Sequence, residues 1–295
     1  MKTRLRELRF AIEYAAVRGA LWMAGALPIG VARAFGAATG SLAWVLGVRR
    51  EVCLDNITKA LGVSRSEASR IMRSSYQNFG RSLMEFAAFR RWSGPDLLKH
   101  VEFDGVENFE AALARGKGAV CVGGHIGNWE LMAASIGRRG FPMNLLVGQQ
   151  TNSRVDDVMN ELRRSQEVGI ITRTSALRKV LQALRANELV ALLADQDARK
   201  GGVMVEFLGR PASTVRGPAL FAVRSGSPII PILIHRENGR HRVRAEAPIW
   251  ADPSLDEDAA ILELTRRHAD ALARHVRAHP DEYFWPHRRW KTQGV

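Results

Sequence analysis

Short apolar runs alternate with segments of helical periodicity from about residue 100 onward, and this alternation limits the fold more than any other feature of the sequence. The runs are five or six residues long and lie at 118–122, 143–147, 189–194 and 229–234. Helical segments are expected near 107–115, 129–138, 154–167, 175–186 and 216–225. Buried strands that alternate with helices are typical of parallel sheets with crossover helices. The sequence therefore predicts an α/β fold with a mostly parallel central sheet flanked by helices.

Residues 1–48 differ in composition from the rest of the chain. A basic opening leads into apolar segments at 19–32 and 34–48, which Arg33 separates. This pattern is typical of a helix or bent helical pair that lies in or dips into an anionic bilayer. A cleaved signal peptide and a packed helical hairpin are the alternatives. We expect a membrane-associating helical segment over 1–48 and one α/β domain over 49–295.

Further helix signals occur on both sides of the predicted sheet. Residues 49–92 have helical periodicity, and Ser64 stands three residues before Glu67, which is the spacing of a capping box. A long helix is expected from about Asp256 to Arg277. The aromatic and basic sequence YFWPHRRWK follows it at 283–291.

The charge of the chain indicates an anionic partner. The 295 residues carry a net charge of +13, which suits a membrane surface, a phosphorylated substrate, an acidic protein or nucleic acid. Because the basic residues are scattered as pairs and match no binding motif, no nucleic-acid partner is expected. Cys53 and Cys121 stand 68 positions apart, which supports neither a disulfide framework nor a cysteine-rich metal site. A reducing compartment is expected.

The segment GGHIGNWE carries the candidate chemistry. His125 follows a predicted strand, and Glu130 lies in the first turn of the next predicted helix, with Asn128 as its expected cap. A chain that curls at this turn could bring the Glu130 carboxylate to the imidazole. The carboxylate would then fix the tautomer and leave the other ring nitrogen free to act as a base. The alternative is a histidine at the end of a strand beside a capping glutamate, with no catalytic role.

Glycines surround this histidine, and competing site motifs are absent from the sequence. Gly123, Gly124 and Gly127 are expected to let a substrate approach the backbone closely. The cluster does not match the G-x-G-x-x-G pattern of a dinucleotide site. The sequence also contains no G-x-S-x-G, H-E-x-x-H or P-loop motif. A general-base mechanism without a nucleophilic serine or a metal is therefore favoured.

GGHIGNWE resembles the H-x4-D/E block of the glycerolipid acyltransferase superfamily. The chain as a whole is similar to the bacterial lipid A late acyltransferases, the lauroyl and myristoyl transferases, and to their mannoside acyltransferase relatives. The resemblance extends over nearly the whole chain, in matching order and spacing. It includes the apolar N-terminus, the helical stretch ending in SLMEF, VEFDGVENFEAAL, GGHIGNWE, ADQD at 194–197, FLGRPASTVRGPALFA at 207–222 and the closing WPHRRWK.

The resemblance implies roles for individual residues. His125 would be the base and Glu130 the acid that orients it, while Arg164 and Asp195 would complete the polar site. Arg163 is the alternative to Arg164, because a shift of one position in the alignment exchanges them. The remaining residues expected at the substrate are Gly124, Asn128 and His287, the last with a structural role or a role at a lipid phosphate.

The reaction that the resemblance implies is transfer of an acyl group from a thioester to a hydroxyl of a glycolipid, most simply a lipid A precursor. The expected donor is acyl carrier protein, with coenzyme A as the alternative. We expect no metal and no other cofactor, and a location on the cytoplasmic face of the cell inner membrane. Another glycolipid acceptor, a lipid or thioester hydrolase with the same His/Glu pair, and a non-catalytic membrane scaffold are the competing hypotheses.

Overall fold

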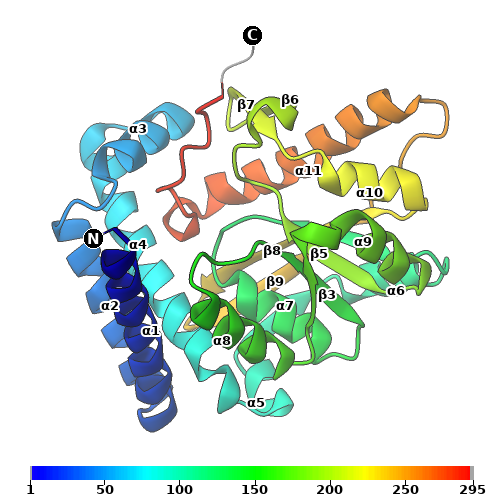
Figure 1. The fold of residues 1–295 in the computed structure, drawn as a ribbon. Helices are drawn as coiled ribbons and strands as arrows, with labels where there is room; N and C mark the ends of the chain where they lie inside the picture. The colour runs from blue at the N-terminus through cyan, green and yellow to red at the C-terminus, as the bar shows by residue number, and fades with distance from the viewer. Residues whose placement is uncertain (1, 293–295) are drawn as a thin grey trace.

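The computed structural model describes residues 2–292 and contains a seven-stranded central sheet (Figure 1). The strand order is β1-β9-β8-β2-β5-β3-β4, and every neighbouring pair is parallel except β8 and β9. The prediction of an α/β fold with a mostly parallel sheet is confirmed. The strands are β1 (Val101–Asp104), β2 (Ala119–Gly123), β3 (Met143–Val147), β4 (Gly169–Thr172), β5 (Leu189–Leu193), β8 (Ile229–Glu237) and β9 (Arg240–Ala245).

Helices cover both faces of the sheet, and alternate residues of β2 show how each face is buried. Ala119 and Cys121 belong to one hydrophobic cluster, together with side chains of α6, α7 and α8. Val120 and Val122 belong to another, with side chains of α9, α10 and α11. Because both faces are buried, the strand is apolar at every position. The helices are α6 (Val106–Leu113), α7 (Trp129–Gly137), α8 (Ser153–Arg164), α9 (Ala176–Arg185), α10 (Gly217–Ser225) and α11 (Glu257–Ala278).

The strands that the sequence did not predict lie mainly at or beyond the edges of the sheet. At the β1–β9 edge, the Arg242 guanidinium lies 2.9 Å from the Glu102 carboxylate and 3.2 Å from that of Asp104. These strands are held partly by charge pairs across the ladder, so they do not appear as apolar runs. A separate antiparallel hairpin consists of β6 (Val203–Phe207) and β7 (Arg210–Thr214).

Two helices fill most of residues 1–48, and they lie beside α4 (Figure 1). Within residues 2–292, no single helix has both the length and the apolar character needed to cross a membrane. By length and composition alone, α2 and α3 pass that test as a pair bent by 95°. The bounds are α1 (Lys2–Ala26), α2 (Ile29–Val45), α3 (Arg50–Leu61), α4 (Arg65–Ala87) and α5 (Gly94–Leu98).

Glycines let α2 and α4 cross with their backbones in contact. A Cβ atom on Gly80 would lie 1.9 Å from the carbonyl oxygen of Gly36. A Cβ atom on Gly40 would lie 2.1 Å from the carbonyl oxygen of Tyr76. Any side chain larger than a hydrogen atom would therefore force the two helices apart. The N-terminal segment is packed closely onto the helix that leads into the sheet.

The cap predicted for α4 is confirmed, and a side chain also caps α11. The Ser64 hydroxyl accepts a hydrogen bond of 3.2 Å from the Glu67 amide at the start of α4. The Asp256 carboxylate accepts one of 2.8 Å from the Ala259 amide at the start of α11. Each side chain satisfies an amide that has no partner within its helix.

We expect Gly80→Ala to lower the melting temperature, because its methyl group meets the backbone of α2. Overpacking of this kind costs roughly 1–3 kcal/mol. Gly19→Ala is the matched control: Gly19 is also in a helix, but its Cβ position is open, with no atom within 4 Å. Thermal unfolding of the full chain measures both variants. Equal melting temperatures for Gly80→Ala and Gly19→Ala would contradict the close helix crossing.

Candidate active site

The register of the central strands brings His125 and Asp195 together. In the parallel pair β2–β5, Gly123 lies opposite Leu193. His125 and Asp195 each lie two positions beyond these strand ends, so both leave the sheet at the same carboxyl edge. Ligands of open α/β sheets usually bind at this edge.

Asp195 contacts His125 at two points. One carboxylate oxygen lies 2.7 Å from Nδ1 of the imidazole, and the other accepts a 2.9 Å hydrogen bond from the His125 amide. The expectation that Glu130 would hydrogen-bond the ring is therefore wrong, because Asp195 occupies that place. The proton on Nδ1 points at the carboxylate, which leaves Nε2 as the ring nitrogen able to accept a proton.

The charges of this pair stabilise each other. Burial raises the pKa of Asp195, but the charge and hydrogen bonds of His125 outweigh it and bring the pKa to about 2. Burial lowers the pKa of His125, while the charge and hydrogen bond of Asp195 more than compensate, so its pKa lies above the usual value. The Glu130 charge adds to the same effect from a greater distance. The site is a carboxylate–imidazole pair whose basicity depends mainly on Asp195.

The C-terminal segment fixes the turn that carries His125. The Phe284 amide donates a 2.9 Å hydrogen bond to the His125 carbonyl, and the Gly127 amide donates one of 3.0 Å to the Glu282 carbonyl. Ile126 and Tyr283 form an isolated antiparallel bridge between these two bonds. The turn is therefore paired like a short strand. This contact could not be predicted from the sequence, because more than 150 residues separate its two sides.

Protein atoms occupy the space beside Gly124 and Gly127 of the turn. The expectation that these two glycines open the backbone to a substrate is therefore wrong. A Cβ atom on Gly124 would lie 2.6 Å from the Leu272 side chain of α11. Gly127 has a φ of +58°, and a Cβ atom there would lie 2.7 Å from the carbonyl oxygen of Ile234. These glycines allow the turn to pack tightly against α11 and β8.

Glu130 forms a buried ion pair with Arg163. Two guanidinium nitrogens of Arg163 lie 2.9 Å and 2.6 Å from the two carboxylate oxygens. Asn128 caps α7 by accepting a 3.0 Å hydrogen bond from the Leu131 amide, as predicted. Since the helix begins at Trp129, Glu130 projects from its first turn toward α8 and meets Arg163 there instead of His125.

Arg163 and Arg164 have different surroundings, which bears on the ambiguity between them. Arg163 is buried and lines the cavity beside His125. Arg164 is exposed at the end of α8 and does not line this cavity. The placement of Arg164 at the site was therefore wrong by one position, because the helix turns the two side chains to different sides.

A cavity of about 380 Å³ opens beside the imidazole. His125, Glu130 and Arg163 form part of its polar wall. Its apolar wall comes from α4, α7, α8 and the strands β3 and β5. The apolar residues there include Phe79, Leu83, Phe86, Met132, Ala133, Leu145 and Met159. A volume and lining of this kind suit a mostly apolar ligand with one reactive polar group.

A second, basic cavity adjoins the first. It has a volume of about 1220 Å³ and shares Arg173 and Gln196 with the first cavity. Its other cationic side chains are Arg49, Arg199, Arg216, Arg288 and Lys291. His287 lies in this wall, where its Nε2 accepts a 2.9 Å hydrogen bond from the Asp197 amide. His287 thus has a structural contact, and the expectation of a lipid-phosphate role stays a prediction.

A buried carboxylate lies behind Asn128, and the sequence did not predict that it belongs to the site. Glu85 of α4 accepts a 2.8 Å hydrogen bond from the Asn128 amide group. It also accepts hydrogen bonds from Arg33 at 2.7 Å and from Arg236 at 2.6 Å and 2.9 Å. Glu85 lies in the SLMEF segment. The only indication of its role in the sequence is that an acid stands between two apolar residues, Met84 and Phe86.

Comparison with known proteins gives one family. The family described as "Bacterial lipid A biosynthesis acyltransferase" matches residues 1–292. A phosphatidylinositol mannoside acyltransferase of Mycobacterium tuberculosis is 26% identical over 243 residues, which cover 80% of this chain and 75% of the relative. A lipid A biosynthesis palmitoleoyltransferase of Escherichia coli is 24% identical over 282 residues, which cover 94% and 90%.

A solved structure is also similar to this chain. It is the 1-acyl-sn-glycerophosphate acyltransferase PlsC of Thermotoga maritima, with a TM-score of 0.37 and 16% sequence identity. The match covers 80% of this chain and 97% of the solved chain.

We expect Asp195→Asn to lower the pKa of His125. The substitution removes the negative charge that favours the imidazolium, while the burial that disfavours it remains. The neutral ring then persists to lower pH. An NMR titration of the histidine ring signals in the full chain measures the change, and His125→Gln identifies the signal. An unchanged or higher pKa in Asp195→Asn would show that Asp195 does not control the base.

Proposed function

Because the chain belongs to the bacterial lipid A biosynthesis acyltransferase family, we propose that it moves a fatty acyl group from a thioester to a hydroxyl of a glycolipid. The proposed donor is acyl carrier protein, and the proposed acceptor is a lipid A precursor. Coenzyme A is the alternative donor. A phosphatidylinositol mannoside, which appears in the names of the mycobacterial relatives, is the alternative acceptor.

The observation that carries this proposal is the His125–Asp195 pair at the mouth of an apolar cavity. Asp195 holds the proton on Nδ1, at 2.7 Å, and Nε2 is free to take a proton from a hydroxyl group. The imidazole is 23% exposed, so a substrate can reach it. A base in an apolar cavity that adjoins a basic one suits a reaction between an acyl chain and a charged headgroup.

The proposed step needs a base but little acid assistance. The acceptor oxygen attacks the thioester carbonyl carbon while Nε2 of His125 takes the hydroxyl proton. The tetrahedral intermediate then collapses, the carbon–sulfur bond breaks, and the leaving sulfur receives the proton from the imidazolium. Since a thiol has a pKa of about 8.5, it leaves readily. The Asp195 carboxylate stabilises the imidazolium that forms between the two proton transfers.

Arg163 is the proposed stabiliser of the negative charge that develops on the carbonyl oxygen. Its guanidinium lines the cavity, and Glu130 and Asn160 accept three of its five N–H bonds. In this proposal the other two donate to the substrate oxygen. Glu130 would then be a positioning residue, because its two hydrogen bonds hold the guanidinium plane against the cavity.

The apolar and basic cavities support separate places for the two substrates. The apolar side chains of α4 and α7 can enclose an acyl chain next to His125. The arginines of the adjoining cavity can bind the phosphates of an anionic glycolipid. Arg173 lies between the two, where the acceptor hydroxyl would enter.

We also propose that α1 and α2 bind the enzyme to the cytoplasmic face of the inner membrane. Large apolar side chains are exposed on both helices, and Arg4, Arg6 and Arg9 are exposed on α1. An apolar face beside arginines suits an anionic bilayer surface. The exposed apolar side chains at 5–48 are Leu5, Leu8, Ile12, Trp22, Val31, Phe35, Leu42, Val45, Leu46 and Val48.

An acyl-transfer assay with acyl-acyl carrier protein and a lipid A precursor tests the function. We expect His125→Ala to lower the transfer rate by about 10²- to 10⁴-fold, the usual contribution of a general base. We expect Arg163→Ala to lower it by about 10²- to 10³-fold, the usual cost of a lost oxyanion donor. Arg164→Ala, the matched control at the neighbouring exposed position, should retain the wild-type rate.

Mass spectrometry of the products separates the competing hypotheses. An acylated glycolipid supports the transfer, and free fatty acid released at the same rate without acceptor would show a hydrolase. Transfer to phosphatidylinositol mannoside in preference to lipid A precursor would replace the proposed acceptor. Full activity in a folded His125→Ala protein would reject the mechanism, and absence of acyl transfer by the folded wild type would support the scaffold hypothesis.

Membrane binding is tested with surface substitutions, because α2 packs on α4 and its deletion would uncover that helix. We expect the triple variant Leu8→Ser, Ile12→Ser, Trp22→Ser to bind anionic phospholipid vesicles more weakly than the wild type. Leu262→Ser removes a similarly exposed apolar side chain from α11 and should have no effect. Cosedimentation with vesicles measures both. Equal binding by the triple variant and the wild type would place the membrane contact elsewhere.

A further inference from the structure

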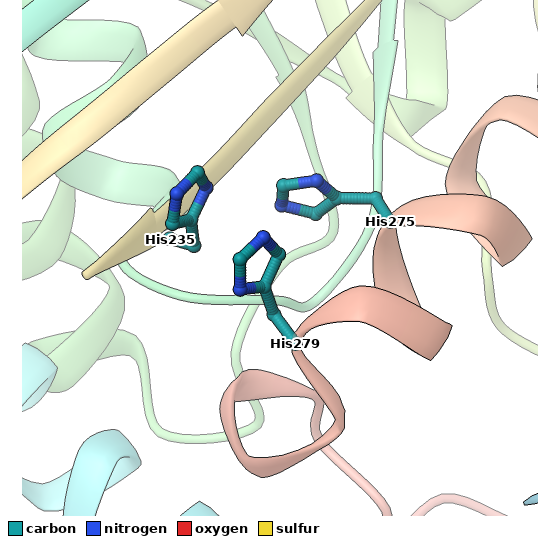
Figure 2. Close-up of side chains that lie close together, drawn as sticks. All are labelled: His235, His275 and His279. Atoms are coloured by element: carbon teal, nitrogen blue, oxygen red, sulfur yellow. The ribbon is translucent and has the colours of Figure 1, made fainter. Parts of the chain in front are cut away.

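Three histidines gather where the end of α11 meets β8 (Figure 2). His235 comes from β8, whereas His275 and His279 lie four positions apart at the end of α11. A spacing of four residues puts two side chains on the same face of a helix. One ring nitrogen of each histidine lies within 4.8 Å of the corresponding nitrogens of the other two. None of the three lines the cavities beside His125.

The hydrogen-bonding state of the cluster suits a ligand. Nδ1 of His235 is buried and has no hydrogen-bond partner among residues 2–292. Nε2 of His275 lies 3.2 Å from the carbonyl oxygen of Ile234, a contact of the kind that orients metal-binding histidines. A buried polar atom without a partner costs free energy, which a bound ion would recover.

We propose that His235, His275 and His279 form a binding site for one divalent transition-metal ion of the zinc type. Imidazole nitrogen is a preferred ligand of zinc, and three histidines with a water molecule complete a tetrahedral site. The site would be separate from the catalytic base, so acyl transfer by His125 does not pass through it.

The three nitrogens lie within 4.8 Å of one another and must move closer together to bind one ion. With Zn–N bonds of about 2.0–2.1 Å, tetrahedral geometry places ligand nitrogens about 3.3 Å apart. The rings of His235 and His279 are stacked, with centroids 3.8 Å apart and planes 12° apart. The two rings must tilt toward a shared point, and His275 lies 4.8 Å by centroid from His279 on the same helix face.

A metal at this place would join the end of α11 to β8. The chain continues from His279 through the short turn Pro280–Glu282 to Phe284, whose amide binds the His125 carbonyl. The Ile234 carbonyl next to His235 is the atom that Gly127 packs against. The ion would therefore stabilise α11 and β8, the two elements that support the turn carrying His125.

Metal titration of the full chain, prepared without a polyhistidine tag and stripped with a chelator, tests the proposal. We expect isothermal titration with Zn²⁺ to show one ion bound per chain. Loss of an outer-shell partner costs about 10- to 100-fold in affinity, so loss of a ligand in His279→Ala should cost more than about 100-fold. Zn²⁺ should raise the melting temperature of the wild type but not of His279→Ala.

His100→Ala is the matched control, because His100 lies outside the cluster, with its ring against that of Trp92. It should bind Zn²⁺ as the wild type does. His235→Ala provides a second test, and circular dichroism checks that each variant is folded. Binding of Zn²⁺ with unchanged affinity in His279→Ala, or failure of the wild type to bind one equivalent, would overturn the proposal.

Discussion

Glu85 joins α2, the sheet and the start of α7 through one buried charge. Its side chain is fully inaccessible, yet Arg33 of α2, Arg236 of β8 and the Asn128 cap of α7 all donate hydrogen bonds to it. An ionised carboxylate without such partners would cost several kcal/mol to bury. All three elements must therefore be in place before the charge is satisfied. This requirement links the start of α7, and so the position of Glu130, to the docking of α2.

His125 and Asp195 show which part of a site sequence alone can supply. Both follow apolar runs that end at the carboxyl edge of a parallel sheet, so their shared location could be predicted without coordinates. Their direct hydrogen bond could not, because it depends on β5 being the neighbour of β2 in the strand order. Glu130 stands near His125 in the sequence, which made it the apparent partner. In the structure, the Glu130 side chain instead points from the first turn of α7 toward Arg163.

The strands at the β1–β9 edge, which the sequence did not predict, are held partly by contacts between charged groups. Strand β9 alternates arginines with buried residues, and its Arg242 meets acids of β1 and β8, so no apolar run marks it. Arg163 and Arg164 are chemically identical in the sequence, and the helical rotation between them sends one into the cavity and the other to solvent. Hydrophobic periodicity predicts the layers of this fold, whereas its polar contacts depend on which layers meet.

The turn that carries His125 is held on several sides by parts of the chain that are distant in sequence. Gly124 packs on α11, Gly127 packs on β8, and the segment at 282–284 pairs with the turn through backbone hydrogen bonds. Asp195 accepts hydrogen bonds from the His125 backbone amide and from Nδ1 of its ring, and these bonds fix the orientation of the ring. A base held this way loses little freedom when a substrate binds, so binding need not reorganise it. In the proposed mechanism the glycines act indirectly, because only they allow the supporting backbone to come so close.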